Sequence, residues 1–187
     1  MLPFTVPSRD QVAPEAQAIF DQFQQAMGKM PNLYATMGYS ANALATYVQY
    51  TRGQVKNSFH ARDREGIYLI VSQINGCEYC LASHTASALK AGWKEEDTLT
   101  LRAGTHPDKK WQVIYAIIRS TIDNKGEVSD ALQKDFAALG FGDGAMIDLF
   151  VLINVMSFTN YVFRLTQIPI DFSLAKEISI ESVEDHL

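Results

Sequence analysis

Residues 62–92 read RDREGIYLIVSQINGCEYCLASHTASALKAG, and the prediction of the fold starts from them. The spacing of its apolar residues predicts a helix over residues 62–74, with one face made by Ile67, Ile70, Val71 and Ile74. The β-branched content of this segment leaves a strand as the alternative. We prefer the helix because the neighbouring segments are also helical in pattern.

The dipeptide Asn75-Gly76 marks a turn between two helices. The second helix is predicted to start at or near Cys77 and to cover residues 77–91. If the chain folds back at the turn, Glu65 lies about 15 Å before it and His84 about 12 Å after it, at 1.5 Å of rise per residue. We therefore expect Glu65 and His84 to lie side by side.

The rest of the chain shows the same helical pattern, with Gly, Pro and Ser at the expected helix ends. We predict an all-α fold, a multi-helix bundle of about seven or eight helices forming a single domain over residues 1–187. The tail, residues 166–187, is expected to be extended and packed on a neighbour, or partly disordered. The further predicted helices cover residues 14–27, 41–55, 95–103, 107–123, 129–139 and 144–165, and residues 31–37 are expected to add a short turn of helix.

Charge and the N-terminal sequence limit the classes of partner. The net charge is -5 and the 16 Lys and Arg are scattered, so nucleic acid is not expected as a partner. The first seven residues, MLPFTVP, have neither a basic segment nor a long apolar one. We therefore expect no secretory signal and a cytoplasmic location.

The most apolar stretch, residues 145–158, is interrupted by Asp148 and Asn154. It is shorter than the roughly 20 apolar residues that cross a bilayer, so we predict a buried helix and no membrane span. The apolar face of residues 145–163 is larger than one monomer should expose. Part of it is expected to be an interface in a homo-oligomer.

Cys77 and Cys80 are the only two cysteines of the chain, and in a reducing compartment such a pair is more often catalytic or metal-binding than structural. Helical steps of three and four residues place Cys77, Cys80 and His84 on one stripe. Burial in the core and zinc binding, by these three residues with Glu65, are the alternatives. We expect no metal because no second cysteine pair or close histidine pair exists.

A free thiol with a pKa of about 8.5 is mostly protonated at neutral pH, and the helix dipole supplies only about 0.3–1 kcal/mol toward the thiolate. His84, four residues after Cys80, is placed to supply more, so Cys80 is the expected nucleophile and Cys77 the resolving cysteine. The reverse order stays open, because the first cysteine of such pairs is often the more acidic. Glu65 is the candidate to orient His84.

The arrangement Glu65, eleven residues, then Cys77-x-x-Cys80-x-x-x-His84 resembles the motif of AhpD-like alkylhydroperoxidases of the carboxymuconolactone decarboxylase superfamily. The resemblance is strongest over residues 64–92, and Pro31-Asn32 is similar to a longer, peroxidase-related branch. It implies an AhpD-like fold, Cys80 as the peroxidatic cysteine, Cys77 as the resolving cysteine, and Glu65 with His84 as a proton relay. One departure is Tyr79, which stands where the best-known members have a second histidine.

The expected function is that of a thiol-dependent, antioxidant peroxidase or a disulfide oxidoreductase, using the redox motif 65–84. Its substrate is expected to be a hydroperoxide or a disulfide, with no separate cofactor. The resemblance implies a dithiol reductant protein of the lipoyl or thioredoxin type, and a homo-oligomer, from dimer to trimer to hexamer, with active sites near subunit contacts. A non-enzymatic redox sensor or oligomeric binding module is the alternative.

Overall fold

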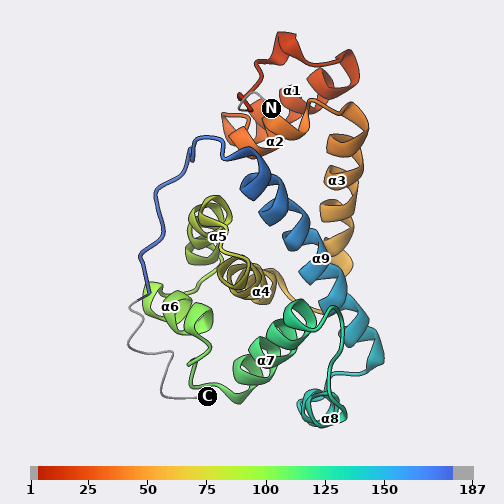
Figure 1. The fold of residues 1–187 in the computed structure, drawn as a ribbon, viewed down its shortest axis with the longest axis vertical. Coiled ribbons are helices and arrows are strands. Elements are labelled where there is room, and N and C mark those ends of the chain that lie inside the picture. Colours follow the sequence, from red (N-terminus) through yellow and green to blue (C-terminus); the bar gives the residue numbers. More distant parts are fainter. Residues whose placement is uncertain (1–3, 179–187) are drawn as a thin grey trace.

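The computed structural model of the protein describes residues 4–178, and these residues form helices and no strands. The all-α prediction is confirmed (Figure 1). Two short 3-10 helices, Arg9–Gln11 and Gln54–Lys56, accompany the α-helices. The α-helices of the described residues are α1 Pro14–Met27, α2 Asn32–Met37, α3 Ala41–Gly53, α4 Ala61–Ile74, α5 Glu78–Lys90, α6 Glu95–Ala103, α7 Lys109–Asp123, α8 Asp130–Ala138 and α9 Asp143–Thr166.

Most of the predicted helix boundaries agree with the structure to within two residues. The 62–74 segment is a helix and not a strand. Three details differ: the described residues hold nine α-helices, the 3-10 turn at Arg9–Gln11 was not predicted, and the helix expected from Pro107 starts at Lys109. It starts later because the Asp108 side chain caps it by accepting the Lys110 N–H.

Helix α4 is the centre of the bundle, and α5, α6, α7 and α9 pack around it. Every residue from 66 to 72 is buried, so this helix is enclosed on all sides. Gly66 lets the indole rings approach, since a Cβ there would lie 2.8 Å from a Trp111 ring carbon. The enclosure explains the strand-like composition of the segment: a fully surrounded helix can be apolar on every face.

Helix α9 runs along the molecule with α3 on one side and α4 and α5 on the other (Figure 1). Within the described residues it is the one helix long and apolar enough to cross a membrane by length and composition. Its inner face, which includes Leu149, Leu152 and Met156, belongs to the hydrophobic core. The inner face of α9 is therefore buried, as predicted.

Polar side chains of α9 hold the turn between α4 and α5. The fully buried Asn160 donates to Ser72 Oγ at 3.3 Å and accepts from Asn75 Nδ2 at 3.0 Å. Arg164 donates to the Asn75 carbonyl at 3.2 Å. Gly76 closes the turn with φ +64°, a conformation that favours glycine. These contacts fix where α5 begins.

Residues 167–178, which follow α9, are named the C-terminal strap. The strap runs in extended form from the end of α9 past α5 to α6 (Figure 1). Buried Arg102 of α6 donates to the Lys176 carbonyl at 2.7 Å, and Lys176 Nζ bonds Glu95 at 2.6 Å. The prediction of an extended tail is confirmed for these residues, while residues 179–187 lie outside the described part.

Candidate functional site

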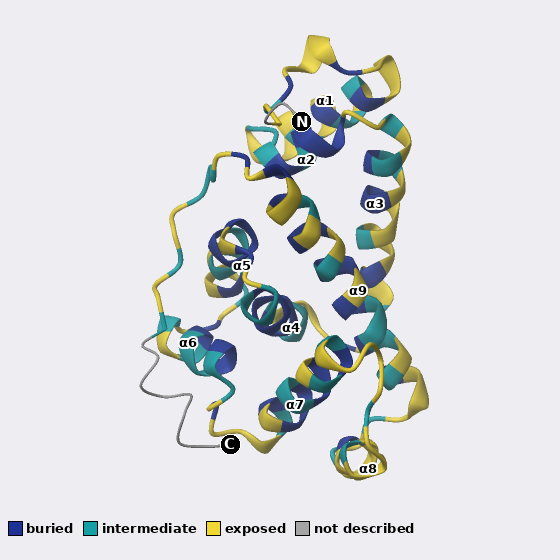
Figure 2. Cartoon of the chain, in the orientation of Figure 1, coloured by how far each residue is buried: buried dark blue, intermediate teal, exposed yellow. Residues whose placement is uncertain are grey.

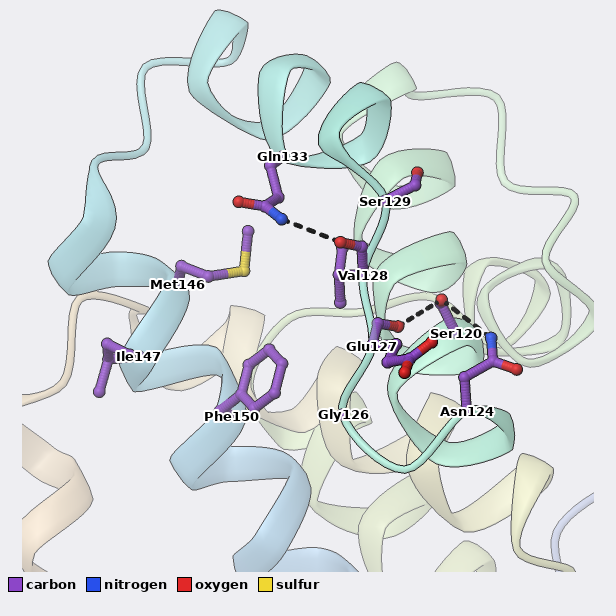
Figure 3. A pocket seen from close by; sticks show the side chains of 10 residues that line it. All are labelled: Ser120, Asn124, Gly126, Glu127, Val128, Ser129, Gln133, Met146, Ile147 and Phe150. Carbon is purple, nitrogen blue, oxygen red and sulfur yellow. Dashed lines mark hydrogen bonds between the residues drawn. The ribbon is translucent and has the colours of Figure 1, made fainter.

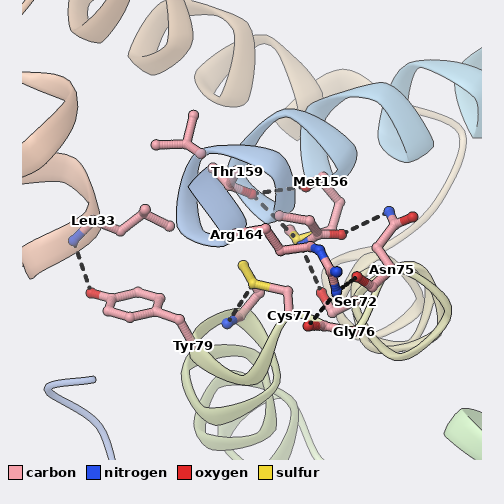
Figure 4. Close-up of a disulfide and its surroundings, with 12 residues drawn as sticks. Leu33, Ser72, Asn75, Gly76, Cys77, Tyr79, Met156, Thr159 and Arg164 are labelled. Carbon is pink, nitrogen blue, oxygen red and sulfur yellow. Dashed lines mark hydrogen bonds between the residues drawn. A yellow bond between two sulfur atoms is a disulfide. The ribbon is translucent and has the colours of Figure 1, made fainter. Parts of the chain in front are cut away.

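The two cysteines lie at the first turn of α5. Cys77 is the N-cap residue and Cys80 is in the first turn of the helix, with 5.4 Å between their Cα atoms. Their sulfur atoms form a disulfide (Figure 4). The pairing shows that the helix start brings both sulfurs within bonding distance, as the Cys-x-x-Cys spacing predicted.

The backbone of α5 favours negative charge on Cys77. Its Sγ accepts the N–H of Cys80 at 3.3 Å, the hydrogen bond that an N-cap side chain makes. After reduction, the same N–H and the positive end of the helix dipole would stabilise a thiolate at Cys77. This backbone environment suits either role for Cys77, attacking or resolving, and leaves the order of the two cysteines open.

Glu65 of α4 and His84 of α5 lie side by side, as the folding-back of the chain predicted. Glu65 Oε2 is 2.8 Å from His84 Nδ1. Both side chains are partly buried, and the Tyr68 ring packs beside the imidazole with 5.0 Å between centroids. A carboxylate on Nδ1 orients the ring and leaves Nε2 for proton exchange.

The sulfur atoms are almost fully covered: Cys77 is 0% and Cys80 2% exposed. A cavity of about 190 Å³ lies near them, and neither cysteine is part of its lining. Met156 of α9 connects the two features, because it lines the cavity and also lies in the surroundings of the disulfide (Figure 4). A reactant that enters this cavity therefore meets His84 and Met156, and not the sulfurs, in its lining.

Hydrogen-bond donors dominate the polar lining of the His84 cavity. Burial raises the pKa of Tyr34, Tyr47 and Tyr68, so their phenols stay protonated at neutral pH and can donate. Arg64 adds a cation to this wall. The sequence pattern singled out none of these four residues as part of a cavity. Helical periodicity could not separate a core tyrosine from one that borders a cavity.

Tyr79, between the two cysteines, ties the motif to the C-terminal strap. Its hydroxyl donates to Asp171 Oδ1 at 2.6 Å and accepts the buried Leu33 N–H at 3.2 Å. Asp171 also accepts from Lys29 Nζ at 2.9 Å. Burial, and then the bond to Asp171, raise the pKa of Tyr79, so its hydroxyl stays protonated. No local sequence signal pointed to Asp171, which is far along the chain.

A larger cavity, of about 680 Å³, lies between the α7–α8 connection and the start of α9 (Figure 3). Several of its polar groups are already paired within the protein. Ser120 Oγ donates to the Glu127 carbonyl at 2.7 Å, and Gln133 Nε2 donates to the Val128 carbonyl at 2.9 Å. No cysteine or histidine lines it, so it is not the candidate redox site.

Metal binding finds no geometric support in the described part of the chain. Residues 4–178 contain no group of three or more His, Cys, Asp and Glu side chains arranged to hold a metal ion. The zinc alternative required Cys77, Cys80, His84 and Glu65 to converge on one point. In the structure Glu65 instead bonds His84 and the sulfurs bond each other.

Comparisons with known proteins find a match over the part of the chain that holds the candidate site. The model of the carboxymuconolactone decarboxylase family matches residues 41–120, which include the Glu65, cysteine and His84 positions. No curated protein is significantly similar in sequence. Residues 41–120 are therefore similar to this family, as the sequence motif indicated.

Solved structures with the same fold cover nearly the whole chain. A peroxidase-related protein from Silicibacter sp. TM1040 has a TM-score of 0.77 at 21% identity, covering 96% of this chain and 92% of its own. A peroxidase-related protein with an AhpD core from Ralstonia eutropha JMP134 has a TM-score of 0.78 at 15% identity, covering 97% and 94%. The debrominase Bmp8 with bound 2,3,4-tribromopyrrole has a TM-score of 0.73 at 16% identity, covering 90% of each.

The Tyr79 contacts predict a stability effect. Tyr79→Phe removes the acceptor of the buried Leu33 N–H and the donor to Asp171, so we expect the free energy of unfolding to fall by about 1–3 kcal/mol. Tyr39→Phe is the matched control, because the Tyr39 hydroxyl bonds Thr5 on the exposed surface. Urea denaturation measures both variants, and equal stabilities would contradict the structural importance of the Tyr79 contacts.

Proposed function

We propose that this protein is a thiol-dependent peroxidase or disulfide oxidoreductase whose reacting groups are Cys77 and Cys80. One observation carries the proposal: a cysteine pair at a helix start, with a carboxylate-oriented histidine one helical turn further along the same helix. The AhpD-like fold supports a peroxidase-related enzyme.

The proposed reaction is a two-electron reduction of a hydroperoxide. The Cys80 thiolate attacks the terminal peroxide oxygen, an S–O bond forms, the O–O bond breaks and an alcohol leaves with a proton. The Cys77 thiolate then attacks the Cys80 sulfur and releases water as the disulfide forms. A dithiol donor of the lipoyl or thioredoxin type reduces this disulfide by thiol exchange and is itself oxidised.

His84 and Glu65 are proposed to move the protons of these steps. His84 takes the thiol proton and returns it to the leaving oxygen, and Glu65 holds the imidazole through Nδ1. The tyrosine hydroxyls of the cavity would donate to the peroxide oxygens. The covered sulfurs suit this scheme, because burial shields a thiolate from most reactants in bulk solvent.

The first prediction for this function concerns turnover. With a dithiol donor, wild type is expected to consume many equivalents of hydroperoxide per subunit and Cys80→Ser none. Cys77→Ser is expected to consume one equivalent and to leave a sulfenic acid on Cys80 that a dimedone probe traps. If the one-equivalent behaviour appears in Cys80→Ser instead, Cys77 is the attacking cysteine.

Two results of the turnover assay would change the assignment of function. Consumption of no more than one equivalent by wild type would contradict an enzyme and leave the redox sensor, in which the disulfide switches shape or partner choice. If the enzyme turns over a bromopyrrole but no hydroperoxide, the proposed dithiol chemistry would stand and the substrate class would be a halogenated pyrrole. The debrominase of the same fold makes a tribromopyrrole the appropriate probe.

The second prediction concerns the proton relay. His84→Gln and Glu65→Gln are each expected to lower kcat/KM for hydroperoxide by about 10²-fold, since general acid and base groups contribute 10²- to 10⁴-fold. The double variant should lose little more than either single variant, because the two side chains act as one unit. Glu78→Gln is the control, as it removes an exposed carboxylate beside Cys77 that bonds neither residue. A Glu65→Gln enzyme as active as Glu78→Gln would contradict the relay.

The third prediction concerns substrate size. A cavity of about 190 Å³ has room for about six waters at roughly 30 Å³ each, so hydrogen peroxide and tert-butyl hydroperoxide should be reduced and long-chain lipid hydroperoxides only poorly. Val55→Trp, at an exposed residue of the lining, should lower kcat/KM for tert-butyl hydroperoxide more than for hydrogen peroxide. Leu174→Trp is the exposed control outside the cavity. Equal rates for lipid and small hydroperoxides would exclude this route to the sulfurs.

A further inference from the structure

A further cavity, of about 410 Å³, lies between the C-terminal strap and the helices α4, α5 and α6. We name it the strap cavity. The strap contributes residues 174–178 to its lining, and the helices contribute Gln73, Glu78, Leu81 and Arg102. Among the described residues it shares no lining residue with the His84 cavity, so it is separate from the proposed redox site.

Arg102 makes the strap cavity unusual, because it is a buried cation. This residue is 4% exposed, and no other Lys, Arg, Asp or Glu of residues 4–178 is buried. Figure 2 shows that α6 is partly buried, whereas the strap beside it is mostly exposed or intermediate. A guanidinium stays charged at neutral pH, so its burial in a protein normally requires an anionic partner.

The hydrogen-bond partners of Arg102 in the described part of the chain are neutral. Its Nε donates to Gln73 Oε1 at 2.9 Å, and its Nη1 donates to the Lys176 carbonyl at 2.7 Å. Burial lowers the pKa of Arg102, and no described carboxylate raises it. Lys176, by contrast, is exposed and yet forms an ion pair with Glu95. The buried cation therefore has no counter-charge where the exposed one has.

Arg102 also keeps hydrogen-bonding capacity for a ligand. A guanidinium carries five N–H donors, and Nη2 has no partner within residues 4–178. The described side-chain N and O atoms that are both fully shielded and unpaired are the hydroxyls of Thr85 and Thr121. Nη2 of Arg102 is therefore open to the cavity that this side chain lines. The free N–H groups of a guanidinium match the two oxygens of a carboxylate.

The rest of the lining limits the kind of anion. Two exposed carboxylates, those of Glu78 and Glu177, also border the cavity and would repel a second negative charge. Dicarboxylates and phosphate monoesters are therefore disfavoured. The remaining lining is apolar and suits an organic ligand better than an inorganic ion. It consists of Leu81, Leu174, Ala175 and Ile178.

We propose that the strap cavity binds a small organic monocarboxylate, with its carboxylate on the Arg102 guanidinium and its aliphatic or aromatic part against the apolar lining. The ligand supplies the one negative charge that the buried guanidinium lacks. It contacts both the strap and the first turn of α5, so it holds these two segments together.

The chain itself is a second source of the same carboxylate chemistry. Residues 179–187 follow directly after Ile178 of the lining, and their sequence includes Glu181, Glu184 and Asp185. The experiment therefore needs one arm for a free carboxylate and one arm for these residues.

The first arm titrates full-length wild type with hexanoate by isothermal titration calorimetry. Hexanoate is expected to bind with a Kd of about 0.1–1 mM. 1-Hexanol has the same carbon chain without the charge, and adipate has a second carboxylate. Each should bind more weakly than hexanoate by roughly tenfold or more, because one loses the charge-assisted hydrogen bonds and the other meets the carboxylates of the lining.

The second arm uses variants of the cation. Arg102→Gln should raise the Kd for hexanoate by roughly tenfold or more, and Arg102→Lys should raise it less, because lysine keeps the charge without the guanidinium fork. Lys29→Gln is the matched control. It removes another bond to the strap, that of Lys29 Nζ to Asp171 at 2.9 Å, without changing the cavity lining. Thermal unfolding of every variant identifies any protein that has lost its fold.

The third arm distinguishes the two sources of carboxylate. A full-length variant with Glu181→Gln, Glu184→Gln and Asp185→Asn is titrated with hexanoate beside wild type. Binding by both proteins is the expected result. Binding by this variant alone would overturn the free ligand and assign the Arg102 site to the carboxylates of the chain itself.

Three other results would overturn the proposal. Hexanoate could fail to bind to either protein, 1-hexanol could bind as tightly as hexanoate, or folded Arg102→Gln could bind hexanoate as tightly as Lys29→Gln. The first two measurements use unaltered Arg102, so they hold even if Arg102→Gln does not fold. All of these results are independent of peroxidase turnover.

Discussion

The site depends on the reversal of the chain between α4 and α5. Gly76 adopts a left-handed conformation, and the Asn160 and Arg164 side chains of α9 bond the residues of the turn. Because the two helices then run side by side, Glu65 and His84 meet although they are 19 positions apart. The same turn makes Cys77 the N-cap residue of α5. One turn therefore positions both the sulfurs and the imidazole.

Much of this arrangement could be predicted from the sequence because it is local. Helical periodicity and the glycine at the turn predicted where α4 and α5 run. The helical rise of 1.5 Å per residue then predicted that Glu65 and His84 lie side by side. The enclosure of α4 was harder to foresee, since the apolar residues of a helix buried on all sides also fit a strand. The single-domain organisation of all 187 residues stays a prediction.

The parts that could not be predicted come from residues distant in the sequence. Asp171 reaches Tyr79 across 92 positions and Met156 reaches the disulfide from α9. Neither contact leaves a pattern within a single helix. The cavity has the same origin, because its tyrosines come from α2, α3 and α4 and share no periodicity. The near-complete covering of the sulfurs likewise results from tertiary packing and not from the motif.

The hydrogen bond between Tyr79 and Asp171 joins the first turn of α5, which holds the cysteines, to the C-terminal strap. Thermodynamic coupling is reciprocal. If disulfide formation changes the free energy of the Tyr79–Asp171 hydrogen bond, then forming or breaking this bond changes the free energy of disulfide formation by the same amount. A ligand or partner that binds the strap, or Lys29 beside it, would then adjust the reduction potential of sulfurs that it never touches.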